Sequence, residues 1–297
     1  MLKRWGLILL ILVGSVTWVF QKEATFTKEA VSLSVPAKAV LVMEADSGNI
    51  LYEENGSDSL PIASMTKLMT QYLVMNAVKN GKLSWDSLYV PSESVLQMTG
   101  LSGAVKLGLE AGAEYSVREL FTAMTVISAN DAAVALAEMV AGTEEAFVEM
   151  MNAQARAFDL QETAFYNSTG LDGEYIGRSA EETNHSSARD VGVIAKELIA
   201  RHPAVLEYTR IQNITTRQGV DMWSTNLMLD GMPQAMSGID GLKTGYTEAA
   251  GSCFSSTGVF DGRRVISVVI GVEAVEQDTI HPRFELTREL IDRFVLN

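Results

Sequence analysis

Alternation of apolar and polar positions near the N-terminus predicts a β-hairpin. Residues 39–43 and 49–52 alternate on either side of Asp46-Ser47-Gly48, a turn sequence typical of hairpins. Strand patterns return only in the last third of the chain, where Asp261-Gly262 marks a second hairpin turn. These late strands are predicted over residues 211–216, 241–246, 251–259 and 264–272.

The middle of the chain has helical periodicity instead. From Ser64 to about residue 200, apolar residues recur at spacings of three and four. The first helix is predicted to start after Pro61 and to end at Asn80-Gly81, with an apolar stripe of Leu68, Tyr72, Leu73 and Val78. A final helix is predicted over 282–295.

The order of these elements indicates the fold class. The first hairpin has to pair with the late strands to give a sheet of useful width, so the helical part is an insertion between them. We therefore expect an α/β fold, an antiparallel sheet flanked by helices, with a large helical insertion over about residues 65–200. With 297 residues and 47% hydrophobic content, the chain can bury one large core or two closely joined lobes.

The N-terminus has the layout of an export signal. Lys3-Arg4 precede an apolar run from Trp5 to Phe20, and no Ala-x-Ala-like cleavage site follows. We expect residues 1–20 to be a signal peptide or an N-terminal membrane anchor, 21–35 a polar tether and 36–297 the functional domain. Because the chain stops just after its last predicted helix, no C-terminal membrane anchor is expected.

The net charge of the chain disfavours two classes of binding partner. A net charge of −14 argues against nucleic-acid binding and against docking on anionic lipid through a basic surface. The only cysteine, Cys253, has no internal disulfide partner and lies in a predicted buried strand, so a small core residue is favoured over a second nucleophile.

Three short motifs indicate the chemistry. Ser64-Met65-Thr66-Lys67 is the chain's only Ser-x-x-Lys, Lys243-Thr244-Gly245 is its only Lys-Thr-Gly, and Ser128-Ala129-Asn130 lies between them. In this order they form the motif set of penicillin-recognising serine acyl enzymes. A second Ser-x-Asn sequence, Ser224-Thr225-Asn226, lies close before Lys243 without flanking helices, so Ser128 is preferred.

The first motif suits an activated nucleophile. A serine hydroxyl needs a neighbouring base, and side chains three residues apart on a helix lie on one face. Ser64 would also lie near a helix N-terminus, where free N–H groups stabilise an oxyanion. Lys67 then has two possible roles. Burial and a second cation, for which Lys243 is the candidate, would lower its pKa and make it the base; alternatively it stays charged and positions the serine.

Each motif also has a purely structural interpretation. Ser64 alone could be a helix cap and Lys67 a solvated residue, but the presence of all three motifs argues against this. The segment from Ser128 to Asp131 lies between two apolar helical segments, so its Asn and Asp are expected to cap a helix as well as to function.

With these motifs the chain resembles the low-molecular-mass penicillin-binding proteins, the serine D-Ala-D-Ala carboxypeptidases of bacterial cell-wall maturation. The resemblance covers about residues 36 to 297 and implies a β-lactamase/transpeptidase-like fold. The matching stretches are 62–70, 128–133, 167–173 (Asn-Ser-Thr-Gly-Leu-Asp-Gly), 186–190 (Ser-Ser-Ala-Arg-Asp) and 241–247 followed by Ala250-Gly251.

The resemblance implies roles for individual residues. Ser64 would be the acylated nucleophile, Lys67 its base, and Ser128 a proton relay to the leaving amine. The substrate-binding residues would be Asn130 for the amide, Lys243, Thr244 and Gly245 for the carboxylate wall, Tyr246 for an oxyanion hole formed by its N–H and that of Ser64, and Arg283 near the terminal carboxylate. Arg283 has an alternative as a helix residue paired with Glu285 or Glu289.

The expected activity is removal of the terminal D-Ala from peptidoglycan stem peptides through an acyl-Ser64 intermediate, with β-lactams acylating the same serine. A D,D-endopeptidase is the nearest variant. A β-lactamase would need a glutamate-positioned water, and Glu162, Glu181 and Glu182 lack the pattern for it. An extracellular β-lactam or peptidoglycan sensor is the non-enzymatic alternative, which would be expected to have lost part of the motif set.

No metal or organic cofactor is implied. His185, His202 and His281 have no metal-ligand spacing, which disfavours a zinc peptidase, and there is no Gly-x-Ser-x-Gly elbow for a Ser-His-Asp triad. The expected partners are stem peptides ending in D-Ala-D-Ala and β-lactams, with membrane contact only through the N-terminal segment. The expected location is outside the cytoplasmic membrane.

Overall fold

The computed structural model describes residues 33–274 and 277–297. The predicted signal or anchor at 1–20 and most of the tether at 21–35 therefore lie outside the described residues. Among the helices of the described part, none combines the length and the hydropathy that crossing a bilayer requires.

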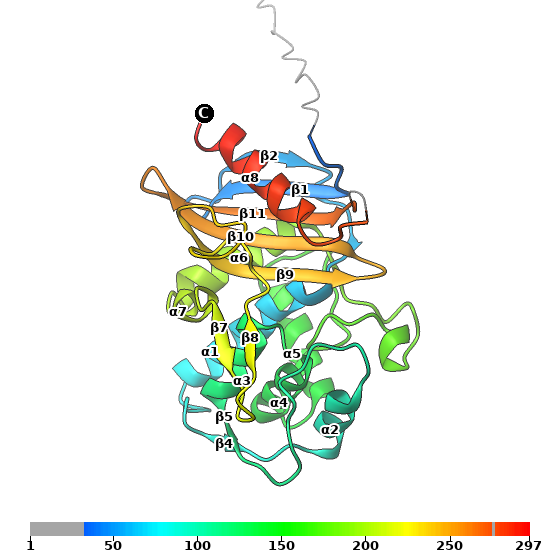
Figure 1. Ribbon diagram of the computed structural model, residues 1–297. Coiled ribbons are helices and arrows are strands. Elements are labelled where there is room, and N and C mark those ends of the chain that lie inside the picture. Colours follow the sequence, from blue (N-terminus) through cyan, green and yellow to red (C-terminus); the bar gives the residue numbers. More distant parts are fainter. Residues whose placement is uncertain (1–32, 275–276) are drawn as a thin grey trace, which may run out of the picture. The chain divides into compact units, whose positions relative to one another are not determined.

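A five-stranded antiparallel sheet forms one side of the fold (Figure 1). The strand order is β2-β1-β11-β10-β9, so the early hairpin pairs with the late strands as predicted. Ala39 lies opposite Ile270, and Glu44 lies opposite Val265. The sheet strands are β1 (Ala39–Glu44), β2 (Ile50–Glu54), β9 (Ile239–Thr247), β10 (Gly251–Phe260) and β11 (Arg263–Val272).

Both faces of this sheet are covered by helices, which explains why its central strands β1, β11 and β10 are buried on both sides. Helix α8 (Pro282–Phe294) packs on β11 and β10, and α6 (Ala188–Arg201) packs on β11 and β1 from the other face (Figure 1). Leu41 and Met43 of β1 closely approach Gly192 of α6. The predicted α/β fold with antiparallel sheet and helical insertion is confirmed.

The helical insertion surrounds one largely buried helix. Helix α4 is rich in alanine and packs against α1, α2, α3 and α5, because its small side chains allow close approach. Ser116 and Glu119 form a capping box that starts α3. The helices of this region are α1 (Lys67–Lys79), α2 (Glu93–Gly100), α3 (Val117–Val126), α4 (Asn130–Ala141), α5 (Glu144–Ala157) and α7 (Val205–Thr209), besides α6.

Several short elements have no counterpart in the sequence pattern, because two or three residues are too few to show a period. The strand predicted over 211–216 is the shorter β7, and it pairs with β8 in a hairpin in front of α3 (Figure 1). The short elements are β3 (Leu60–Pro61) with β6 (His185–Ser186), β4 (Leu88–Tyr89) with β5 (Tyr115–Ser116), β7 (Asn213–Thr215) with β8 (Asp221–Trp223), and the 3-10 turns η1 (Ala63–Thr66) and η2 (Glu174–Ile176).

Candidate active site

The three motifs meet in one cleft. Its volume is about 880 Å³, and it lies between the edge strand β9, the turn that carries Ser64 and the turn between α3 and α4. Of the predicted site residues, those that line it are Ser64, Ser128, Asn130, Thr244, Gly245, Tyr246 and Arg283. A second cavity of about 250 Å³, between α3 and the β7–β8 hairpin, contains no motif residue.

Ser64 lies on the 3-10 turn η1, and the regular helix α1 begins only at Lys67, about one turn later than the predicted start after Pro61. Ala63, just before it, has a φ of +46°, a strained conformation for a residue with a side chain. Two glycines pack closely against this strained backbone. An added β-carbon on Gly170 would lie 2.0 Å from the Ala63 carbonyl oxygen, and one on Gly245 would lie 3.2 Å from the Ser64 nitrogen. The backbone of Ser64 is thus held from two sides.

Lys67 begins α1 and is completely buried. Its Nζ lies 3.0 Å from the Ser64 Oγ, 2.8 Å from the Asn130 Oδ1 and 2.6 Å from the Thr169 carbonyl oxygen. The last two oxygens only accept hydrogen bonds, so they take two N–H groups of the amine. A neutral amine would then direct its lone pair at the Ser64 hydroxyl, which is the arrangement of a general base.

The surroundings favour that neutral form. Burial is the largest cause that lowers the pKa of Lys67 well below its usual value, and the nearby positive charge of Lys243 lowers it further. The charges of Asp131 and Glu144 oppose the shift. The third motif therefore supplies the second cation that the sequence argument required.

The second motif contributes a turn rather than a cap. Ser128 has a φ of +67°, and within the described residues its hydroxyl has no hydrogen-bond partner, which leaves it free for a ligand. Asn130 donates its Nδ2 to the Val105 carbonyl at 3.0 Å, and this fixes its Oδ1 toward Lys67. The predicted capping role is wrong for Asn130, because Asn130 is the first residue of α4 and the N-cap residue before it, Ala129, makes no side-chain cap.

Asp131, the residue after this motif, ties down the neighbouring cleft loop. Its buried carboxylate accepts hydrogen bonds from the N–H groups of Leu107, Gly108 and Leu109, at 2.9 to 3.2 Å. The Thr99 hydroxyl donates to the same group. This network holds the loop that supplies Val105 to Asn130.

The third motif lies on β9, opposite Ser64. Lys243 is buried, and its Nζ donates to the Thr244 carbonyl oxygen at 2.9 Å. Burial and then the charge of Arg283 lower the pKa of Lys243 to about 7. This wall therefore places positive charge behind the Thr244 hydroxyl.

Arg283 belongs to the cleft and not to the surface of α8. Its guanidinium donates to the carbonyl oxygens of Gly245 at 2.7 Å and Cys253 at 3.3 Å. Neither Glu285 nor Glu289 pairs with it, so the alternative of a simple helix ion pair is wrong. Burial lowers the pKa of Arg283, although the group stays charged.

The sequence argument named the loop of Thr169 only as part of the matching stretch 167–173 and gave Thr169 no role in the site. Asn167 Oδ1 accepts from the N–H groups of Thr169 and Gly170 at 3.0 and 2.7 Å, and this turn directs the Thr169 carbonyl at Lys67. The only signal was the turn sequence Asn167-Ser168-Thr169-Gly170 itself, which is typical of a side-chain-stabilised turn.

Cys253 has the surroundings of a core residue. It is completely buried in β10, and burial raises the pKa of its thiol to about 11. The thiol is therefore neutral near pH 7, which disfavours nucleophilic attack. Among the residues that the structure describes, no group of His, Cys, Asp and Glu side chains has the arrangement of a metal site.

Comparison with known proteins agrees with this geometry. The model of the D-alanyl-D-alanine carboxypeptidase family, peptidase family S11, matches residues 24–274. The chain is 35% identical over 254 residues to D-alanyl-D-alanine carboxypeptidase DacF of Bacillus subtilis (strain 168), covering 84% of this chain and 61% of that protein. It is 32% identical over 251 residues to DacC of Escherichia coli (strain K12), covering 81% and 58%. The chain thus spans about three fifths of the length of these relatives.

Solved structures extend the similarity to three dimensions. A peptidoglycan synthesis regulatory factor (PBP3) from Streptococcus pneumoniae superposes with a TM-score of 0.83 at 40% identity, covering 88% of this chain and 72% of that chain. Penicillin-binding protein D2 from Listeria monocytogenes in its cefotaxime-bound form gives a TM-score of 0.74 at 35% identity, covering 88% and 98%. The chain belongs to the D-alanyl-D-alanine carboxypeptidase family, peptidase family S11.

Proposed function

We propose that this protein is a serine D-Ala-D-Ala carboxypeptidase that removes the terminal D-Ala from peptidoglycan stem peptides. The observation that carries the proposal is the placement of the Lys67 amine, whose two carbonyl contacts leave its lone pair for the Ser64 hydroxyl. The curated relatives DacF and DacC have this activity in their names.

Acylation would proceed at Ser64. Its Oγ attacks the carbonyl carbon of the penultimate D-Ala while Lys67 takes the hydroxyl proton. The N–H groups of Ser64 and Tyr246 stabilise the oxyanion, since Gly245 brings that strand against the Ser64 backbone. The C–N bond then breaks, Ser128 passes a proton to the leaving amine, and D-Ala departs. Water hydrolyses the Ser64 ester in the second step and restores the free serine.

The opposite wall would select the substrate. A peptide that ends in D-Ala carries a free carboxylate next to the scissile bond. Lys243 and Arg283 supply positive charge at this wall, and Thr244 presents a hydroxyl to the cleft. Asn130 would hold the substrate amide. A β-lactam carries both a strained amide and a carboxylate, so it would acylate the same serine.

A β-lactamase has less support. None of the three glutamates considered for a deacylating water, Glu162, Glu181 and Glu182, lines the cleft. The acidic residues that line the cleft are Asp172, Glu174 on η2 and Glu248.

The test is product analysis with the purified full chain. Incubation with a diacetyl-Lys-D-Ala-D-Ala peptide should release D-alanine, and benzylpenicillin should add its mass to the peptide that contains Ser64. Folded protein that forms the penicillin adduct without releasing D-alanine would support an endopeptidase or a sensor. Rapid turnover of penicillin would support a β-lactamase.

We expect kcat/KM for the D-Ala-D-Ala peptide to fall as the pH rises through about 7. Lys243 has its pKa lowered to about 7, and only its protonated form attracts the substrate carboxylate. Since the protonated fraction falls above the pKa, binding weakens on the alkaline side. A bound carboxylate favours the ammonium form of Lys243. The decrease of kcat should therefore occur at a higher pH than the decrease of kcat/KM.

Initial rates between pH 5 and 10 would test this expectation, with Lys243→Arg as the comparison. An arginine stays charged throughout this range, so the decrease of kcat/KM near pH 7 should be absent in the Lys243→Arg variant. An alkaline limb that is the same in both proteins would mean that another group titrates.

The same proposal places the reaction outside the cytoplasm. Lys3-Arg4 and the apolar run up to Phe20 support export of the rest of the chain, either with removal of the segment or with its retention as an anchor. Cell fractionation followed by N-terminal sequencing of the mature protein would distinguish the two.

A further inference from the structure

The segment Ser224-Thr225-Asn226, which was set aside in favour of Ser128, nevertheless reaches the active site. It lies between β8 and β9, and Thr225 lines the same cleft as Ser64 and Thr244. Its two neighbours, Ser224 and Asn226, are both buried and do not line the cleft. One side chain of this segment is thus presented to the ligand space.

The backbone at Thr225 is well fixed. Its N–H donates to the Val126 carbonyl at 3.1 Å, at the end of the helix that leads to Ser128. The Ser224 hydroxyl accepts from the Asn226 N–H at 3.1 Å, and the Asn226 Oδ1 accepts from the Met228 N–H at 3.0 Å. The position of the Thr225 side chain is therefore set by contacts on both sides of it.

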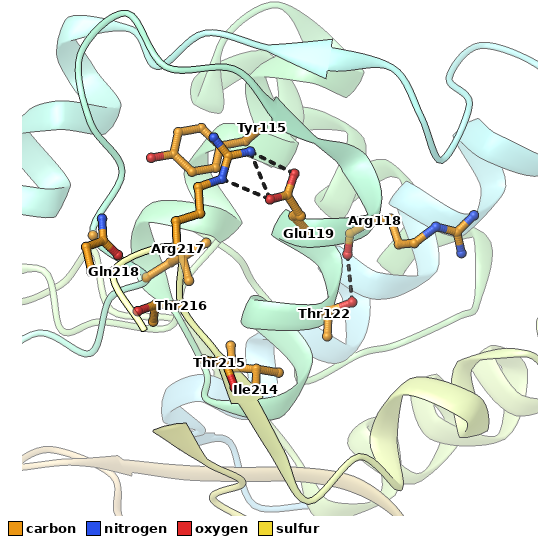
Figure 2. Close-up of a pocket in the computed structure, with 11 residues that line it drawn as sticks. Tyr115, Arg118, Glu119, Thr122, Ile214, Thr215, Thr216, Arg217 and Gln218 are labelled. Atoms are coloured by element: carbon orange, nitrogen blue, oxygen red, sulfur yellow. Dashed lines mark hydrogen bonds and ion pairs between the residues drawn. The ribbon is translucent and has the colours of Figure 1, made fainter. Parts of the chain in front are cut away.

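The hairpin that carries this segment is also fixed to the helical part. Figure 2 shows the Arg217 guanidinium, from the β7–β8 turn, against the Tyr115 ring and directed at the Glu119 carboxylate. The guanidinium carbon is 4.2 Å from the ring centroid, and the closest nitrogen is 2.9 Å from Glu119. The Arg217 contact holds the turn before β8 against α3, and the Thr225 N–H holds the chain after β8 against the end of α3.

The hydroxyl of Thr225 is paired with that of Thr244. The two oxygens are 2.7 Å apart, and Thr244 is only 5% exposed. The Thr244 hydroxyl donates to the Thr225 oxygen, so the proton of Thr244 is used in this bond and the proton of Thr225 stays free to donate. Among the described residues, the Thr225 hydroxyl has no other hydrogen-bond partner, and Lys243 and Arg283 make this wall positive. The remaining proton is therefore offered to a negatively charged acceptor in the cleft.

We propose that Thr225 is a substrate-binding residue whose hydroxyl, held by the hydrogen bond that it accepts from Thr244, donates to the carboxylate of the substrate and thereby helps select ligands with a free carboxylate. This inference rests on the proposed function. With Thr244 as its donor, the hydroxyl of Thr225 has a fixed partner and a fixed direction. Without the Thr225 hydroxyl, the carboxylate loses this donor and the preference for an anionic ligand weakens.

The test compares two acylating agents that differ only in the carboxylate: benzylpenicillin and its carboxyl methyl ester. The measured quantity is the ratio of the second-order rate constants for adduct formation at Ser64 in the full-length protein. Thr225→Val, which keeps the shape and loses the hydroxyl, should lower this ratio about tenfold, because a hydrogen bond to a charged group has that value. Thr225→Ser should restore it. Thr215→Val, on the same hairpin and exposed, should leave the ratio as in the wild type.

A double-mutant comparison shows whether the hydroxyls of Thr225 and Thr244 act as one unit. In a Thr244→Val background, adding Thr225→Val should change the ratio by less than twofold. An unchanged ratio in Thr225→Val, or an equal loss of both rate constants with no restoration by serine, would overturn the inference while the wild type still acylates. A wild type that forms no Ser64 adduct would instead refute the proposed function, and the inference with it.

Discussion

Replacement of Lys67 by methionine is expected to slow acylation of Ser64 by about 10²–10⁴-fold, the usual contribution of a general base. Methionine has a similar length but neither takes a proton nor donates one. The Ser64 hydroxyl would lose its acceptor, and the oxygens of Asn130 and Thr169 would lose their donor. The rate of adduct formation with benzylpenicillin, followed by the mass of the intact protein, measures the effect.

Lys67→Arg distinguishes a base from a positioning charge. Arginine keeps the positive charge, but its very high pKa prevents it from taking the serine proton. If Lys67 only positions Ser64, the arginine variant should retain a large part of the activity; if Lys67 is the base, it should be as slow as the methionine variant. Lys79→Met is the matched control, because Lys79 lies on the same helix, exposed and away from the cleft, and its loss should leave the rate unchanged. A Lys67→Met rate within tenfold of the wild type would contradict the assignment.

The sequence predicted the side chains of this site better than its backbone. The spacing of Ser64 and Lys67 was sufficient to place both groups together, because a helical turn brings residues three apart onto one face. The carbonyls of Thr169 and Val105, which hold Lys67 and Asn130, could not be found in this way. A backbone acceptor is present at every residue, so only the folded path of the loop makes one of them special.

The fold, too, was predicted from the sequence only in part. Long periodic segments predicted the five-stranded sheet and its partner helices, since those periods record which face of each element is buried. Strands of two residues left no such record. Arg283 is the instructive case: its helix was predicted, but the sequence left Glu285 and Glu289 of the same helix open as partners, and only the packing of α8 on β10 directs the guanidinium to Gly245 and Cys253.

Gly170→Ala is expected to destabilise the protein by about 2–4 kcal/mol and to abolish acylation. Gly170 has a φ of +84°, and an added β-carbon would lie 2.0 Å from the Ala63 carbonyl oxygen and 2.9 Å from the Ser64 nitrogen. These are backbone atoms, so no rotation of a side chain relieves the contact. The turn that carries the nucleophile has to move, and the Ser64 N–H moves with it.

Gly81→Ala separates this steric effect from the cost of the backbone conformation. Gly81 has a φ of +72°, but an added β-carbon there meets no atom within 4 Å. The control should therefore lose only about 1 kcal/mol, the usual cost of a left-handed conformation for alanine, and should acylate at the wild-type rate. Urea unfolding and the rate of penicillin adduct formation measure both variants. Equal stability and equal acylation in the two would show that the approach of Gly170 to Ala63 does not fix the nucleophile. A larger loss in Gly170→Ala would show that the strained turn at Ser64 is held by its glycine neighbours and not by the helix that follows it.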